Sequence, residues 1–369
     1  GLGRRIAEVV DDDVSTYGGQ GPAGRFREIE IELEEGTDEE ILNGLVSCLR
    51  EAGAGPVTRM SKLARALGTP ALRDPDVVVT EPGDDPSVEE VIRAAISRSV
   101  RRFIVHMPGV HLGQDPESLH QARVATRRLR SDLRTFASLL DQGWVGSLRD
   151  ELRWMGGALG TVRDVDVLTL RLVGTSQHLP TADRYPLRVM MTMLHAEREK
   201  WRRALLKAAG EERYLELLDR MVDAANHPRL LPSADRPSRE ALLELARAPF
   251  ELLVQTVEEL PDKPADPDLH RIRIRAKRVR YAAEAVAPVV GKRAFRFAAA
   301  AARLQGTLGE LQDSAFAHAW LVKASQHHPA VAFTAGQLAG FELARAEAAR
   351  TGWPAAWQEL SRDKLRSWM

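Results

Sequence analysis

The sequence predicts a mainly α-helical protein with two similar halves, preceded by a small α+β segment. Three observations carry this prediction. From Ser87 to the C-terminus, every segment has helical character and the expected helix-start signals. A basic motif that begins at His120 returns at His270, 150 residues later. Stretches rich in Pro, Gly and Asp separate these regions. The simplest architecture is two helical halves, each about as long as a four-helix bundle.

These breaks set the expected domain boundaries. We expect a partial α+β segment over residues 1–67, a linker over 68–86, a first helical half over 87–226 and a second over 238–369.

The first segment contains a predicted strand. Residues 25–33 alternate charged and apolar side chains with period two, which places Glu28, Glu30 and Glu32 on one face. Residues 6–10 are the expected partner strand, with the turn at residues 11–13. Thr37 or Asp38 then caps a helix to about residue 51.

The helical region begins with a capping box. Ser87 is followed three residues later by Glu90, and the helix is expected to run to about His106. The next helix is expected from Pro116 to Leu140, and it carries the first basic motif. Further helices are expected near 144–158, 164–173, 182–209 and 212–225, near Ser238, and after Pro267, where the second basic motif lies.

Composition limits the function classes. The formal net charge of the 369 residues is zero, but acidic residues gather near the N-terminus while the two repeated helices are almost purely basic, so overall neutrality does not exclude anion binding. The single Cys48 excludes a disulfide framework and a cysteine-based metal site, which fits a reducing, cytoplasmic compartment. We find no signal peptide and no apolar run long enough to span a bilayer, so no membrane partner is expected.

The repeated motif forms a basic stripe on each of two helices. At 100° per residue, Arg123, Arg127, Arg130 and Arg134 all fall within roughly 80° of His120, on one side of it. Arg128 lies nearer the flank, and apolar residues take the opposite side. In the second copy, Arg273, Lys277 and Arg280 flank His270 in the same way. Each helix therefore has a core-facing side and a row of cations.

A solvated charged face is the simplest alternative. Such a face normally alternates acidic and basic residues four positions apart, whereas this stripe has almost no acidic partner before Glu284. Arginine also matches phosphate better than lysine does. Nucleic acid is the usual partner of arginine stripes, but neither helix has an aromatic on the stripe for base stacking. Repeated phosphates remain, and inorganic polyphosphate fits at least as well as DNA.

The residues that carry these features resemble a known family. The run from Leu119 to Arg130, with Trp154 to Asp166 downstream, is similar to the conserved histidine α-helical domain, CHAD. The resemblance covers about residues 87–369 and appears in both halves. It implies two four-helix bundles related by pseudo-twofold symmetry, with a cationic groove or tunnel that binds inorganic polyphosphate.

On matching positions, the resemblance implies polyphosphate ligands in both halves. They are His120, Arg123, Arg127, Arg128, Arg130 and Arg134, and then His270, Arg273, Lys277, Arg278, Arg280 and Tyr281. Both histidines can donate to a phosphate oxygen, and neither has the neighbours of a metal ligand. Asp164 and Asp313 are expected to cap helices or to orient arginines rather than to catalyse a reaction.

The first segment resembles the C-terminal half of a CYTH domain, the triphosphate tunnel fold. Residues 26–33 and 61–67 carry this likeness. It implies a metal role for Glu28, Glu30 and Glu32, with Mg²⁺ or Mn²⁺, and a phosphate role for Lys62. The family's N-terminal strand is missing from this chain, which begins with Gly, so a closed tunnel is not expected and a remnant sheet with a solvated acidic face is favoured.

The sequence therefore predicts a non-enzymatic polyphosphate-binding protein that needs no cofactor and associates with polyphosphate or storage granules. Three alternatives stay open. One is a metal-dependent phosphohydrolase that uses the glutamates of the first segment. Another is a nonspecific nucleic-acid binder without base readout, and the last is a scaffold whose basic groove docks an acidic partner.

Overall fold

The computed structural model describes residues 5–18, 21–34, 36–58, 60–68, 73–113, 115–180, 184–235 and 237–369. The chain divides into two compact units, Gly1–Pro75 and Asp76–Met369. This division falls within the segment predicted to be a linker, of which residues 69–72 lie outside the described residues.

The N-terminal unit contains an antiparallel hairpin of β1 (Ala7–Gly18) and β2 (Gly21–Leu33). The strands are longer than predicted, because Asp11 and Asp13 lie within β1 and do not form a turn. Asp11 pairs with Arg27 on β2, and Asp13 pairs with Arg25. Opposite charges on facing strands stabilise an antiparallel pair, which explains why the acidic run extends the strand.

Two helices follow the hairpin. Helix α1 (Glu39–Glu51) begins at Asp38, whose carboxylate accepts a hydrogen bond of 3.0 Å from the backbone N–H of Glu40. Helix α2 (Lys62–Leu67) begins at Ser61. Neither helix contains a fully buried residue, so the helices of this unit enclose no core of their own.

The second unit is helical, and its first half contains α3 (Val88–Leu112), α4 (Pro116–Thr135), α5 (Gln142–Ser176), α6 (Arg184–Ala209) and α7 (Glu212–Asn226). The capping box of Ser87 and Glu90 is confirmed, although α3 continues past His106 to Leu112. The predicted start of a helix at 182 lies outside the described residues, since α6 is described from Arg184.

Two predicted helix boundaries in this half are wrong. Helix α4 ends at Thr135 instead of Leu140, because a 3₁₀ turn over Ala137–Leu139 follows it. The helices expected at 144–158 and 164–173 are one continuous helix, α5. Leu159, Val162 and Val165 are buried on α5, so the apolar face continues through the glycine-containing stretch and packing keeps that stretch helical.

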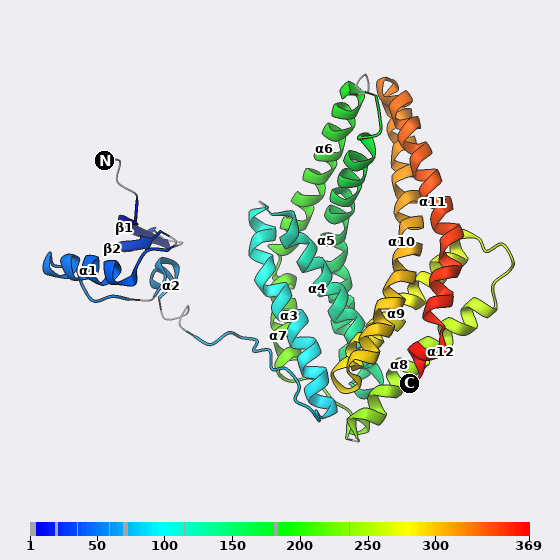
Figure 1. Cartoon of the computed structure of the whole chain (residues 1–369), viewed down its shortest axis with the longest axis horizontal. Coiled ribbons are helices and arrows are strands. Elements are labelled where there is room, and N and C mark those ends of the chain that lie inside the picture. The colour runs from blue at the N-terminus through cyan, green and yellow to red at the C-terminus, as the bar shows by residue number, and fades with distance from the viewer. Residues whose placement is uncertain are drawn as a thin grey trace. The chain divides into compact units, whose positions relative to one another are not determined.

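The second half repeats this order with α8 (Ser238–Glu258), α9 (Asp266–Val290), α10 (Lys292–His327), α11 (Ala332–Leu360) and α12 (Asp363–Arg366). The basic motifs lie on α4 and α9, and each is followed by a helix of 35 or 36 residues, α5 or α10. Figure 1 shows the α5–α6 and α10–α11 hairpins extending away from the other helices of this unit and converging at their ends.

The helices of the second unit pack around two apolar clusters. The larger cluster includes Leu129 on α4 and Val279 on α9, so both halves contribute to one core. The smaller includes Leu172 on α5, Leu194 on α6 and Leu321 on α10, and it joins the two long hairpins near their ends. Within the described part of the chain, no helix is long and apolar enough to cross a membrane.

Candidate phosphate-binding site

The basic stripes of α4 and α9 face the same space between the two halves. Lys277 on α9 is repelled by Arg123, Arg127 and Arg130 on α4 and by Arg273 on its own helix, which shows that the two rows of cations meet. A cavity of about 440 Å³ lies beside them, between α4, α5, α9 and α10. We call it the central cavity.

The lining of the central cavity is rich in cations. Its basic residues are His120, Arg123, Arg127, Arg163, Arg171 and Arg273, and its other polar residues are Asp164, Gln312 and Asp313. Burial, with Arg163 as the next contributor, lowers the pKa of His120 below 6.5. The imidazole is therefore mostly neutral at pH 7, and it has one N–H with which to donate a hydrogen bond.

Glycines on α5 and α10 let arginines of the basic stripes lie against the neighbouring helix. A Cβ at Gly160 would be 1.9 Å from Nη1 of Arg123. Arg123 also donates a hydrogen bond of 3.1 Å to Oδ1 of Asp164. In the second half, a Cβ at Gly309 would be 3.6 Å from Nε of Arg273. The duplication therefore includes an arginine and the small residue that accommodates it.

Asp164 therefore orients an arginine, which is one of the two roles predicted for it. The capping role is wrong for both Asp164 and Asp313, because each lies in the middle of a long helix.

Lys277 has the most perturbed environment among the cations of the site. Burial and the repulsion from Arg127, Arg273, Arg130 and Arg123 lower its pKa from 10.5 to about 7. Its Nζ lies 5.9 Å from the centroid of the Tyr281 ring. Among the described residues, no carboxylate lies within ion-pair distance of this Nζ. The charge of Lys277 therefore has no carboxylate partner within the described structure, although it lies among four arginines.

Several arginines of the site have buried donors that the protein itself does not use. The Nε atoms of Arg127, Arg130, Arg149, Arg273 and Arg278 are buried and lack a hydrogen-bond partner within the described structure. Most buried polar atoms in proteins are hydrogen-bonded, because an unsatisfied donor is costly. A group of such donors on three neighbouring helices is the arrangement expected of an anion site.

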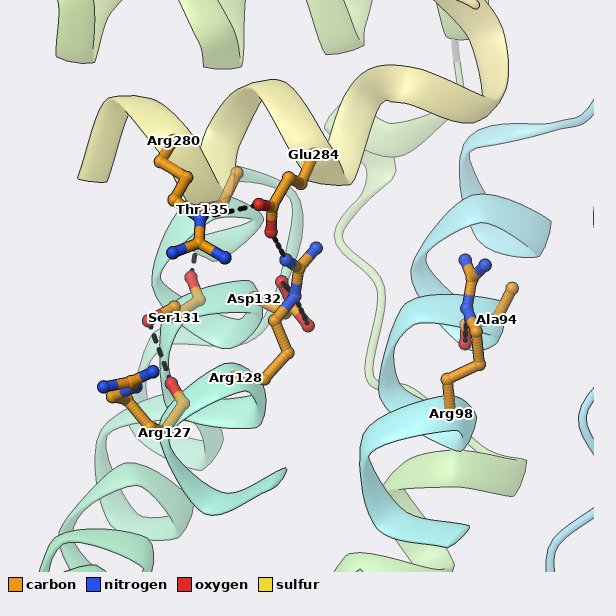
Figure 2. A network of polar contacts seen from close by, with 9 residues as sticks. All are labelled: Ala94, Arg98, Arg127, Arg128, Ser131, Asp132, Thr135, Arg280 and Glu284. Carbon is orange, nitrogen blue, oxygen red and sulfur yellow. Dashed lines mark hydrogen bonds and ion pairs between the residues drawn. The ribbon is translucent and has the colours of Figure 1, made fainter. Parts of the chain in front are cut away.

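Arg128 and Arg280, which were predicted as ligands, are instead paired with carboxylates (Figure 2). Arg128 pairs with Asp132 on α4 and with Glu284 on α9. The guanidinium of Arg280 donates a hydrogen bond of 2.7 Å to Glu284. The pair of Arg128 and Glu284 connects α4 to α9, and we call the whole group the interhelix network. Its charges are compensated, and it holds the two basic helices together.

Asp132 and the ring of Tyr281 are the buried groups of this network. Asp132 is fully buried, and burial raises its pKa to about 6. The buried ring of Tyr281 lies against Arg128 and Arg280, with the guanidinium carbons 5.3 Å and 5.5 Å from the ring centroid. Tyr281 therefore contacts cations of the protein itself.

The two repeated histidines have different surroundings. His120 is partly buried and lines the central cavity. His270 is exposed and does not line it. The sequence repeat therefore predicted that each histidine lies on the basic face of its helix. The two histidines differ in how far they are buried, and this was not predicted.

The cations of α5 were not among the residues predicted from the sequence. Arg163 and Arg171 line the central cavity, and Arg149 and Arg153 lie beside Arg130 and Arg134 of α4. Arg171 is additionally bound to Glu310, Ser314 and the fully buried Glu342, which ties α5 to α10 and α11. The signal available in the sequence was the four-residue spacing of Arg149 and Arg153 within a predicted helix.

The glutamates predicted to hold a metal face cations of their own unit. Lys62 Nζ lies 2.8 Å from Glu30 and 3.9 Å from Glu28, and it also pairs with Asp12. Arg65 lies 3.7 Å from Glu28. Glu32 is exposed. In the described residues, no three His, Cys, Asp or Glu side chains gather as a metal-binding group, so the metal role of Glu28, Glu30 and Glu32 is not supported.

Comparisons with known proteins agree with this architecture. Two curated relatives, the uncharacterized proteins MT2285 and Rv2226 from two strains of Mycobacterium tuberculosis, are each 29% identical to this chain, and the alignments cover 98% of it and 72% of each relative.

Solved structures share the fold. The CHAD domain from the plant Ricinus communis is 25% identical, with a TM-score of 0.58 and coverage of 76% of this chain and 96% of that one. PptA from Streptomyces chartreusis is 24% identical, with a TM-score of 0.61 and coverage of 74% and 99%. The model of the CHAD domain matches residues 94–322, which is more than half of the sequence, and the chain therefore belongs to the CHAD domain family.

Proposed function

We propose that this protein binds inorganic polyphosphate between its two basic helices. The observation that carries the proposal is Lys277, which has no carboxylate partner among the described residues and lies among four arginines that lower its pKa to about 7. A polyanion would supply the missing negative charge from outside. The unused Nε donors of Arg127 and Arg273 add hydrogen bonds that arginine makes well with phosphate.

A chain of phosphates fits this site better than a single phosphate does. The stripe on α4 extends from Arg123 to Arg134, which is about 16 Å along a helix axis at 1.5 Å per residue. Many weak contacts along one chain add up, and their strength falls as salt rises because counterions are released. We therefore propose binding to long-chain polyphosphate that is tight at low salt and weakens steeply as salt increases.

The role we propose is binding without chemical turnover, in the cytoplasm and at polyphosphate granules. Phosphate release from tripolyphosphate in the presence of Mg²⁺ would favour the hydrolase alternative, provided that Glu30→Gln abolishes it. Nucleic acid is the main competing ligand, because its backbone also presents repeated phosphates. Among the described lining residues of the central cavity, the aromatic rings are those of Phe316 and His120, which do not form a succession of stacking platforms for bases.

The test is isothermal titration calorimetry with long-chain polyphosphate at two salt concentrations, with single-stranded DNA as competitor. The variant Arg127→Glu/Lys277→Glu reverses two central charges, and it should lower the affinity at least tenfold. It is expected to fold, because a carboxylate at either position replaces repulsion with attraction. Unchanged affinity in this variant, or easy displacement of polyphosphate by DNA, would contradict the proposal.

A matched control makes the same change in charge elsewhere. Arg188 and Lys207 are exposed on α6 and do not line the central cavity. The variant Arg188→Glu/Lys207→Glu should bind polyphosphate nearly as the wild type does. An equal loss of affinity in this control would show that net charge, and not the central site, determines binding.

A further inference from the structure

A second group of cations lies outside the central cavity. It consists of Arg130 and Arg134 on α4, Arg149 and Arg153 on α5, and Arg278 on α9. We call it the arginine cluster. None of the five lines the central cavity. Its members come from both halves, and two pairs of them are one helical turn apart on helices that pack against each other.

The antiparallel packing of α4 and α5 brings these residues together. Arg123, near the start of α4, contacts Asp164 and lies beside Gly160 on α5. Farther along α4, Arg130 interacts with Arg153, and Arg134 interacts with Arg149. The arginine cluster therefore lies toward the opposite end of the basic stripe from Arg123, with Arg130 about 10 Å and Arg134 about 16 Å away along α4.

The arginines of the cluster repel one another, and the carboxylates around them offset only a small part of this positive charge. Burial makes the largest contribution to the lowered pKa of Arg149, and repulsion from Arg134, Arg130 and Arg153 lowers it further. For Arg278, Arg134 and Arg275 act in the same direction. In the part of the chain that the structure describes, Asp150 is the carboxylate paired with this group, at 2.6 Å from Arg153. Five positive charges thus face one negative charge.

The arginine cluster also has unused buried donors. The Nε atoms of Arg130, Arg149 and Arg278 are buried without a hydrogen-bond partner, one on each of the three helices. A solvated surface would expose such donors to water, and a purely structural cluster would pair them with carboxylates. Half-buried guanidinium groups that retain free donors and converge from three helices have the features of a phosphate site.

We propose that the arginine cluster is a second phosphate-binding site, distinct from the central cavity, so that the protein holds one polyphosphate chain at two points. This inference rests on the proposed function and adds a requirement for chain length. A single short phosphate chain reaches only one of the two sites, so filling both sites takes two separate molecules. A long chain bridges the two sites past Lys277, which is repelled by Arg127 and Arg273 of the central cavity and by Arg130 of the arginine cluster. Its second contact is intramolecular, which raises its affinity.

The experiment compares tripolyphosphate with long-chain polyphosphate by calorimetry, using Arg149→Glu/Arg153→Glu. Wild type should bind two tripolyphosphate molecules per protein, and the variant should bind one. The affinity for long chains should fall at least tenfold in the variant, with a weaker salt dependence. Arg184→Glu/Arg188→Glu is the matched control, since both residues are exposed and one turn apart on α6.

The outcomes separate this inference from the proposed function. Unchanged stoichiometry and unchanged long-chain affinity in Arg149→Glu/Arg153→Glu would overturn the second site while leaving polyphosphate binding intact. The absence of any polyphosphate binding by the wild type would overturn the proposed function itself. The milder Arg149→Gln/Arg153→Gln should show the same loss of one site, and thermal unfolding of both variants shows whether they fold.

Discussion

Replacing Lys277 with methionine should stabilise the protein and weaken its binding of polyphosphate. Methionine retains an unbranched side chain but carries no charge. In the folded protein, the pKa of Lys277 falls from 10.5 to about 7. Since a pKa change of one corresponds to about 1.4 kcal/mol, holding this lysine protonated in the folded state costs at most about 5 kcal/mol. The methionine variant avoids this cost.

The direction of the pH dependence follows from proton linkage. In the unfolded chain, Lys277 keeps its proton up to its ordinary pKa of 10.5, whereas in the folded protein it keeps the proton only up to about pH 7. Between these values, the unfolded state binds more protons, so the free energy of unfolding of the wild type rises with pH. The stability gained by Lys277→Met is therefore greatest at pH 7 and below, and it vanishes toward pH 10.5.

Urea unfolding of wild type and Lys277→Met at pH about 6.5 and about 9.5 measures this gain directly. Lys207→Met is the control, because Lys207 is exposed on α6. A Lys277→Met variant that is less stable than wild type at the lower pH, or equally stabilised at both values, would refute the reasoning.

Three further predictions concern the same region. Gly160→Ala should lower polyphosphate affinity about tenfold, or about 1.4 kcal/mol, because the new Cβ displaces the guanidinium of Arg123. Gly157→Ala is the control: its Cβ would have nothing within 4 Å, so this variant should bind normally in the same titration. Arg128→Met should lower the free energy of unfolding by roughly 3–5 kcal/mol at pH 7. The loss should be smaller at pH about 5, because burial raises the pKa of Asp132 to about 6 and this carboxylate can then take up a proton. Equal losses in urea unfolding at both pH values would exclude this role. Polyphosphate binding near pH 8 should take up protons, because a bound anion raises the pKa of Lys277. Calorimetry in buffers of different ionisation enthalpy detects this uptake. Binding heats that are independent of the buffer would contradict it.

The basic stripe was predictable because helical spacing is a local property. The positions of Arg123, Arg127, Arg273 and Lys277 on one face of their helices follow from sequence separation, and their recurrence after 150 residues indicated a shared site. The structure confirms that these two faces meet, since Lys277 is repelled by arginines of both helices. The helix starts at Ser87 and Asp38 were predictable for the same reason, since capping depends on neighbouring residues.

The partners of individual cations were not predictable from local spacing. Arg128 and Arg127 are adjacent in the sequence, yet Arg128 pairs with Asp132 and Glu284 while the Nε of Arg127 is buried without a partner. The second of these carboxylates comes from α9, 156 residues away. Only the packing of α4 against α9 separates arginines that stabilise the fold from arginines that remain available to a ligand.

The sequence by itself determined the helical class, the duplicated basic faces and the local starts of helices, because these depend on residues within a few turns of one another. The tertiary structure decided the composition of the site. It brought Arg163 and Arg171 of α5 to the central cavity and Arg149 to the arginine cluster. It also buried Lys277 among like charges. Charges interact through space, so their pairing, repulsion and pKa values depend on how distant helices pack.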